Sequence, residues 1–183
     1  MSNSASRKKA ATQRHRLIEA KASPIGQADG GPRFVADVML GRLAKWLRIA
    51  GFDVVYSNRI TDDELLLSSQ REGRIILSKD TRLLVRKAVR RFIFIESDDV
   101  REQIRQVFRA TGTAALPGLL SRCLDCNAVL ESIAREHVRE RVPPFVFATQ
   151  AGFKRCPACD KIYWAGTHRQ AVLRTLEALL PKR

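Results

Sequence analysis

Short apolar runs alternate with segments of helical periodicity between residues 34 and 112. Several of the helical segments open with an acidic or hydroxyl residue or stop at a glycine, as helix caps do. The expected strands are FVADVM (34–39), FDVVY (52–56), RIILS (74–78) and FIFIE (92–96), and the expected helices cover 40–51, 61–73, 81–90 and 98–112. Strands separated by helices of this length predict an α/β fold with a parallel sheet covered on both faces.

The first expected helix has one apolar face, followed by a glycine that can stop it. That face consists of Leu40, Leu43, Ala44, Leu47 and Ala50. Basic residues flank it on the same helix, and more surround the end of the third strand: Arg42, Lys45, Arg48, Lys79 and Arg82. We expect Arg42, Lys45, Lys79 and Arg82 to contact nucleic acid. A solvated helix face is an equally good interpretation for Lys45 and Arg48.

The segments outside this alternation differ in composition. Residues 1–33 are small, polar and basic and close on Gly30, Gly31 and Pro32, so we expect a disordered basic arm that touches nucleic acid loosely. Its arginine and serine content is also mildly typical of a transit peptide. We expect residues 34–112 to form the α/β domain, 113–120 a linker, 121–168 a small zinc ribbon, and 169–183 a helix and tail.

All four cysteines lie within residues 121–168, in two C-x-x-C motifs. CLDC covers 123–126 and CPAC covers 156–159. Two such knuckles predict a tetrahedral zinc site with Cys123, Cys126, Cys156 and Cys159 as ligands. Disulfides, a redox pair and an iron–sulfur cluster are the alternatives. Four thiolates leave no open position for a substrate, so we expect a structural zinc.

Aspartates occur where the expected strands end. Asp37 lies in the first strand, Asp62 opens the second helix, Asp80 follows the third strand and Asp98 follows the fourth. The carboxyl ends of parallel strands meet at one edge of a sheet, so these acids are expected on the same rim. Each of the last three is also suited to cap a helix, and for the second helix Thr61 is an alternative cap to Asp62. Asp37 is harder to explain in that way, because burying it without a partner or a cation is costly. The set predicts a catalytic cluster that holds Mg²⁺ or Mn²⁺.

The formal net charge of +14 points to a polyanionic partner. The hydrophobic fraction of 45% is that of a globular protein. No apolar stretch approaches the length of a membrane span and no secretory signal is visible, so we expect no membrane partner and a cytoplasmic location. A basic exterior around an acidic metal site predicts metal-assisted hydrolysis of RNA phosphodiester bonds.

Several of these motifs occur together in one known family. The run DVMLGRLAKWLRIAGFDVVY, followed by DDELL, ILSKD, SRC-x-x-CN and CP-x-C-x-x-IYWAGTH, resembles the Mut-seven C-terminal RNase domain family over residues 34–168. The resemblance implies a PIN-like three-layer α/β/α sandwich with an appended zinc ribbon and a metal-dependent ribonuclease activity. Carried over by position, the family's acids fall on Asp37, on Asp62 with Asp63 and Glu64 as neighbours, and on Asp80. Asp98 corresponds to a fourth acid of PIN type.

Two other functions remain open. The chain could be a non-catalytic RNA-binding or ribosome-associated adapter, whose acids only cap helices and whose zinc ribbon and basic surface bind RNA. A receiver-type phosphoacceptor also gathers acids at strand ends, but it normally has a pair of acids directly after its first strand. Asp37 stands alone at that position.

Overall fold

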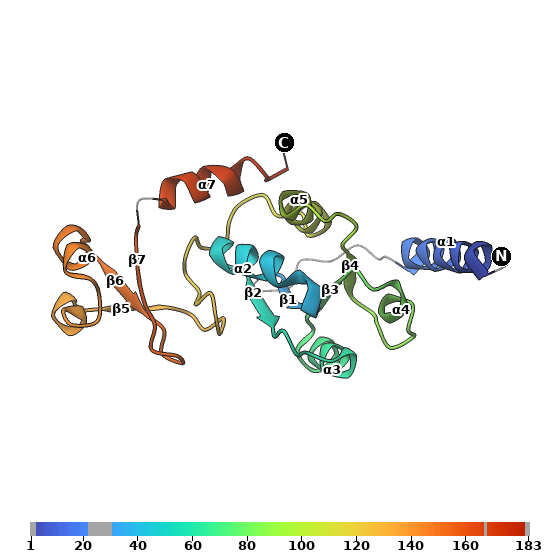
Figure 1. Ribbon diagram of the computed structural model, residues 1–183, viewed down its shortest axis with the longest axis horizontal. Helices are drawn as coiled ribbons and strands as arrows, with labels where there is room; N and C mark the ends of the chain where they lie inside the picture. The colour runs from blue at the N-terminus through green and yellow to red at the C-terminus, as the bar shows by residue number, and fades with distance from the viewer. Residues whose placement is uncertain (1–2, 22–30, 167, 182–183) are drawn as a thin grey trace.

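The structure is a computed structural model that describes residues 3–21, 31–166 and 168–181. The α/β part begins with β1 (Arg33–Ala36), a 3-10 turn (Val38–Leu40), α2 (Gly41–Ala50), β2 (Asp53–Tyr56) and α3 (Asp62–Glu72). It continues with β3 (Ile75–Ser78), α4 (Thr81–Leu84), β4 (Phe92–Phe94) and α5 (Val100–Ala110). The predicted alternation of strands and helices is therefore confirmed (Figure 1).

The four strands form one parallel sheet in the order β2-β1-β3-β4. Val35 of β1 is paired with Val55 on one side and with Ile76 on the other. The chain leaves β1 toward β2 and then crosses back to β3, so the strand order reverses between β1 and β3. In open α/β sheets, the crevice beyond the carboxyl ends of the strands at such a point is where ligands bind.

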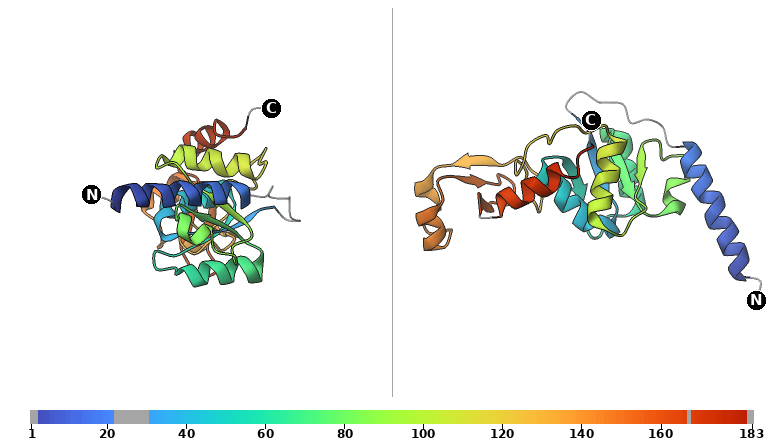
Figure 2. Two further views of the ribbon diagram at one scale, coloured as in Figure 1. Left: turned by 90° about the vertical axis from the view of Figure 1, so that its right-hand side faces the viewer. Right: turned by 90° about the horizontal axis from the view of Figure 1, so that it is seen from above.

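Helices cover both faces of this sheet. On one face, Phe34, Val54 and Leu77 belong to an apolar core with α2 and α5. On the other face, Val35 and Ile76 pack with α3 and α4. Figure 2 shows α5 and α3 on opposite sides of the sheet. The five apolar residues predicted on one face of the helix over 40–51 are all buried, four of them in α2 and Leu40 at the end of the preceding 3-10 turn. This arrangement is the expected three-layer α/β/α sandwich.

The helix expected over 81–90 is the largest departure within the sheet region, because α4 ends at Leu84. The chain then makes two turns, in which the N–H of Arg86 donates to the carbonyl of Leu83 and the N–H of Val89 donates to that of Arg86. Val89 is fully buried in the same core as Leu83 and Leu84. Burial of this β-branched side chain decides the backbone path more than helix propensity does.

The cysteine-bearing part is a three-stranded antiparallel sheet with its own small core. Its elements are β5 (Glu131–Ile133), a 3-10 turn (Arg135–Val138), α6 (Pro144–Thr149), β6 (Phe153–Arg155) and β7 (Ile162–Trp164). After it, α7 (Arg169–Glu177) returns to the α/β part, where Leu176 and Leu179 join the core of α2 and α5 (Figure 1). Leu116 and Leu119, from the expected linker, also pack there.

The N-terminal region differs from the expected disordered arm. Residues Asn3–Lys21 form α1, while most of the Gly- and Pro-containing stretch, 22–30, lies outside the described residues. Ile18 is buried with Leu83 and Leu84, and the Lys21 ammonium donates to the carbonyls of Leu84 and Arg86. One apolar residue and a few polar contacts therefore attach the helix to α4. Within the described ranges, no helix has both the length and the apolar character needed to cross a membrane.

Candidate active site and metal centre

Asp37 lies at the carboxyl end of β1, next to the point where the strand order reverses. Its backbone N–H donates to the carbonyl of Leu77 at 3.0 Å, which fixes it against β3. Only 8% of the residue is exposed. The hydroxyl of Ser78, itself fully buried, donates to Oδ2 of Asp37 at 2.7 Å. No Lys, Arg or His in the described part of the chain forms an ion pair with this carboxylate.

Asp80 is linked to Asp37 through the same serine. The backbone N–H of Asp80 donates to Oγ of Ser78 at 2.9 Å. Its carboxylate caps α4 by accepting from the N–H of Arg82 at 2.7 Å, so the cap expected from the sequence is present. The chain from the Asp80 N–H through the Ser78 hydroxyl to Asp37 holds the ends of β1 and β3 in a fixed relation.

Asp62 and Asp98 lie on the same rim but are engaged by cations. Oδ2 of Asp62 lies 2.7 Å from Nη2 of Arg86, and Asp98 forms an ion pair with Lys79. Neither is a helix cap, which corrects the cap interpretation for both. The cap of α3 is Thr61, in a capping box with Glu64, and the cap of α5 is Asp99. Thr61 directly precedes Asp62, and Asp99 directly follows Asp98, so in both cases a neighbouring residue caps the helix.

The four predicted acids do not converge into one compact cluster. Among the described residues, the four cysteines are the one group of three or more potential ligands whose atoms lie within 4.8 Å of one another. Asp37 and Asp80 nevertheless each keep one carboxylate oxygen without a hydrogen bond from the described protein. Mg²⁺ is commonly held by one or two carboxylates together with several waters, and each of these two residues offers a hard oxygen donor of the kind that such an ion takes.

The predicted nucleic-acid contacts have different surroundings. Arg42 and Lys45 are exposed on α2, and Arg82 is exposed on α4. The ammonium of Lys79 is shared between Asp98 and the carbonyl of Ser97. Lys79 and Arg82 adjoin Asp80 in the sequence, whereas Lys45 is near enough to Asp125 of the first knuckle to help lower the pKa of that carboxyl group. In the described structure Arg42, Lys45 and Arg82 form no ion pair, and Lys79 is held in one.

The four cysteines form a site suited to a metal. Sγ of Cys123 lies 3.5 Å from Sγ of Cys159, and Sγ of Cys126 lies 3.3 Å from that of Cys156. These separations are far longer than a disulfide bond of about 2.05 Å, and all four thiols are free. Four soft sulfurs converging from two knuckles match the ligand set and geometry of a structural zinc ion.

The two knuckles share one backbone pattern. In the first, the N–H of Asn127 donates to the carbonyl of Cys123, and in the second the N–H of Asp160 donates to that of Cys156. Both turns need a left-handed residue after the second cysteine, and Asn127 (φ 70°) and Asp160 (φ 58°) provide it. Asn and Asp enter this region more readily than most residues. The motif is therefore C-x-x-C followed by Asn or Asp.

The surroundings of Cys123 favour its thiolate form, which is the form that binds a metal. Burial opposes ionisation of Cys123, but the backbone N–H of Cys126 and the hydroxyl of Tyr163 favour the thiolate, so the pKa of Cys123 is lowered to about 6. Burial and the same contact with Cys123 raise the pKa of Tyr163, whose hydroxyl remains protonated. Tyr163 thus supports the thiolate of a candidate metal ligand, a role that the sequence did not suggest for it.

The first knuckle is docked on the edge strand β2 by polar contacts that the sequence did not predict. The guanidinium of Arg48, only 4% exposed, donates to the carbonyl of Val54 and to those of Leu124 and Asp125. From the knuckle, Oδ1 of Asn127 accepts from the N–H of Val54 at 3.0 Å. Arg48 is therefore neither a phosphate contact nor a solvated residue. It joins the zinc ribbon to the α/β part.

A partly buried ion pair between Arg74 and Asp53 completes this junction. Asp53 accepts hydrogen bonds from Arg74 at 2.6 Å and from Asn127 at 2.7 Å. Burial alone would raise the pKa of Asp53, but these two hydrogen bonds outweigh it and lower the pKa. Because Asp53 begins β2, this pair lies at the amino edge of the sheet, away from Asp37.

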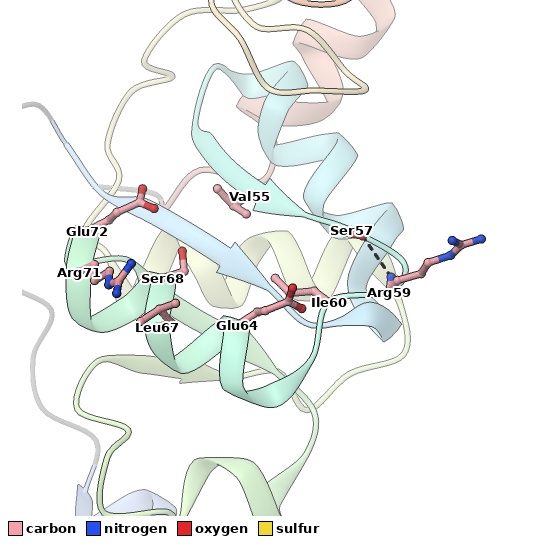
Figure 3. A pocket seen from close by; sticks show the side chains of 9 residues that line it. All are labelled: Val55, Ser57, Arg59, Ile60, Glu64, Leu67, Ser68, Arg71 and Glu72. Carbon is pink, nitrogen blue, oxygen red and sulfur yellow. Dashed lines mark hydrogen bonds between the residues drawn. The ribbon is translucent and has the colours of Figure 1, made fainter.

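A groove of about 440 Å³ runs between β2 and α3 (Figure 3). Its charged lining consists of Arg59, Arg71, Glu64 and Glu72, so positive and negative side chains are equal in number. Glu64 is also committed to the cap of α3. A balanced lining of this kind gives no electrostatic preference for a polyanion.

The comparisons with known proteins point to one family. A family model described as the Mut7-C RNAse domain matches residues 32–176. No curated protein and no solved structure matches the chain. The matched range begins at β1, takes in the rim that carries Asp37 and Asp80, and extends through all four cysteines into α7. The sheet topology and the four-cysteine site agree with the architecture expected for such a domain, and the chain belongs to the Mut7-C RNAse domain family.

Proposed function

We propose that this protein is a metal-dependent ribonuclease whose catalytic cation is held by Asp37 and Asp80. The observation that carries the proposal is the state of Asp37. It is a nearly buried carboxylate at the carboxyl end of the central part of a parallel sheet, with a serine donor but no cationic partner in the described structure. A buried carboxylate of this kind is costly unless something positive binds it.

The chain's own residues prepare this site. Ser78 orients Asp37 by donating to Oδ2, which leaves Oδ1 directed to other partners, and the capping role of Asp80 fixes its carboxylate at the start of α4. A bound Mg²⁺ or Mn²⁺ would polarise the scissile phosphate and lower the pKa of a bound water. Arg42, Lys45 and Arg82 would hold the phosphate backbone beside the acids. Asp62 and Asp98 would join only if they left Arg86 and Lys79.

The four-cysteine site serves the fold in this proposal. Zinc bound by Cys123, Cys126, Cys156 and Cys159 would fix the first knuckle, and Arg48 and Asn127 then hold that knuckle on β2. A site with four thiolates offers no position for a substrate, so the zinc takes no part in the reaction.

The test is cleavage of labelled single-stranded RNA by purified protein in Mg²⁺, in Mn²⁺ and without added divalent cation, with zinc retained throughout. Asp37→Asn and Asp80→Asn are expected to reduce the cleavage rate by about 100-fold or more, because each removes a charged ligand of the cation. Glu96→Gln is the matched control. Glu96 lies just after β4, near the carboxyl edge of the sheet, its side chain is exposed and forms no ion pair in the described chain, and the rate of this variant is expected to stay within about twofold of the wild type.

A second measurement separates catalysis from folding. Mg²⁺ should raise the thermal unfolding midpoint of the wild type and leave that of Asp37→Asn unchanged, because only a protein that binds the ion gains stability from it. Cleavage that survives both substitutions would refute the assignment of the site.

The adapter remains the second candidate, because a specific observation favours it. Asp62 and Asp98 are held in ion pairs, and no three carboxylates of the described chain gather within 4.8 Å. An adapter would bind RNA with strong salt dependence, cleave nothing in any cation, and show no stabilisation by Mg²⁺.

A further inference from the structure

The C-terminal end of α7 approaches α5 at the top of Figure 1, and a groove runs between the two helices there. One section, of about 440 Å³, is lined by Arg101 and Arg105 from α5 and by Arg174 from α7. An adjoining section, of about 540 Å³, is lined by Arg105 and Arg109. Arg105, Ala178 and Leu179 belong to both sections, so the groove is continuous.

All the charged residues that line this groove are positive. Four arginines line its two sections, and none of the residues that line them is acidic. Glu102, on the flank of α5, pairs with Arg105 and lies 3.9 Å from Arg109. Within the described chain, Arg101 and Arg174 form no ion pair and both are exposed. The groove between β2 and α3, by contrast, carries two glutamates beside its two arginines.

The groove between α5 and α7 begins near the carboxyl edge of the sheet, where the candidate catalytic acids lie. Arg101 is in the first turn of α5, and its backbone N–H donates to Asp99, the residue that follows Asp98 at the carboxyl edge of the sheet. From Arg101 to Arg109, successive arginines on α5 are four residues apart, which corresponds to a rise of about 6 Å for each step. This is close to the repeat of phosphates along an extended single strand.

We propose that the groove between α5 and α7 binds the phosphodiester backbone of single-stranded RNA as it leaves the acidic rim. The assignment rests on the proposed ribonuclease function, which makes RNA the occupant of the neighbouring site. Guanidinium groups hold phosphates through paired N–H donors, and a row of them binds without regard to base sequence. Arg101 and Arg174 flank the near section, and Arg105 and Arg109 continue it along α5.

The test uses a double variant, Arg101→Gln with Arg174→Gln, in an Asp37→Asn background with zinc bound. Its affinity for a fluorescent single-stranded RNA of about 12 nucleotides is measured by anisotropy over a range of salt concentrations. The dissociation constant is expected to rise about tenfold. The slope of log affinity against log salt should become shallower by about 1.4, because each lost phosphate contact removes about 0.7.

Arg71→Gln with Arg90→Gln, in the same background, is the matched control. These arginines are also exposed and without ion pairs in the described chain, but Arg71 lies in the last turn of α3 and Arg90 shortly precedes β4, at the amino edge of the sheet. The control is expected to weaken binding less than twofold, and thermal unfolding is used to check that both variants are folded. Equal loss in the two variants, or no loss in the groove variant, would overturn the proposal.

Measurements of RNA cleavage and RNA binding together distinguish a failure of the proposed ribonuclease function from a failure of the groove assignment. If the wild type binds RNA through the groove but cleaves it in neither Mg²⁺ nor Mn²⁺, the catalytic assignment is wrong while the groove stands. If cleavage requires Asp37 but the groove variant binds normally, the catalytic site stands and the groove assignment is wrong.

Discussion

Replacing Arg48 by methionine is expected to loosen the first cysteine knuckle from the α/β part. Methionine has a similar length and no hydrogen-bond donor. The substitution removes two bonds to the carbonyl of Val54, at 3.0 and 2.8 Å, and one bond of 2.9 Å to each of the carbonyls of Leu124 and Asp125. Val54 is fully buried, so its carbonyl gains no water in exchange, whereas Asp125 is exposed.

The size of the effect follows from these contacts. The two bonds to Val54 share one acceptor and together contribute about 2 kcal/mol, and the two bonds to the knuckle add about 2 kcal/mol more. Removal of a buried cation recovers roughly 1 kcal/mol, because its desolvation cost disappears. The free energy of unfolding should therefore fall by about 3 kcal/mol. Arg48→Lys should lose more than half of that, since one ammonium cannot reach the carbonyls of both β2 and the knuckle.

The assay is urea unfolding of the zinc-bound protein, together with the rate at which a competing chelator removes zinc. Arg42→Met, exposed on the same helix, is the matched control and should change the free energy of unfolding by no more than about 0.5 kcal/mol. Arg48→Met should also release zinc faster, because the knuckle that carries Cys123 and Cys126 loses its support. If Arg48→Met behaves like Arg42→Met in both measurements, the proposed junction does not stabilise the protein.

Two further substitutions test other contacts in the same region. Gly51→Ala is expected to lower the free energy of unfolding by about 3 kcal/mol, because φ is +103° and the new Cβ would lie 2.3 Å from the carbonyl oxygen of Gly118. Gly73 is also left-handed but has space around it, so Gly73→Ala should lower the free energy of unfolding by only about 1 kcal/mol. Both values are measured by urea titration. Equal costs would show that Gly118 yields freely. Asp53 has a pKa lowered by Arg74 and Asn127 against the effect of burial, so its contribution to stability is complete above the unfolded-state pKa of about 3.9 and is lost as the pH falls through the folded-state value. Asp53→Asn should therefore be less stable than the wild type at about pH 7 and approach it near pH 3, and a difference that does not change between these pH values would contradict this role.

The sheet and its helices could be predicted because burial of the sheet on both faces requires a recognisable hydrophobic pattern in the sequence. Each strand of a covered parallel sheet is a nearly continuous apolar run, and IILS is buried at all four positions. The buried face of the helix over 40–51 was equally easy to predict, because its five apolar residues at helical spacing all fall on one side of the helix. The four cysteines were predictable for the same kind of reason, since a C-x-x-C knuckle is a local motif.

Element ends were less predictable because neighbouring residues can perform the same task. Asp98 and Asp99 both suit the start of α5, and only the backbone path selects Asp99. The length of α4 is set by the burial of Val89, a contact between segments that no local preference records. The basic N-terminal segment illustrates the same limit. Its composition contains little apolar surface, yet Ile18 is buried against Leu83 and Leu84 of α4.

Arg48 shows why single polar residues near a helix face are the hardest to interpret. It follows Leu47 directly, at the border of the apolar stripe, where a cation is usually solvated. Its partners Leu124 and Asp125 lie 76 and 77 residues further along the chain. The sequence therefore contains the donor and the acceptors but no signal that joins them. Asn127 is similar, since its side chain reaches the N–H of Val54 and the carboxylate of Asp53.

The same reasoning separates the acids of this basic protein. With 33 lysines and arginines against 19 acidic residues, a carboxylate readily finds a cation, and Asp53, Asp62 and Asp98 have each done so. Asp37 is the departure, since it is nearly buried and the described chain offers it only the hydroxyl of Ser78. A protein with so many available cations could neutralise this carboxylate with an arginine, as it does for Asp53. An unpaired carboxylate at the switch point of a parallel sheet is therefore better explained by a cation that comes with the substrate or the solvent than by the needs of the fold.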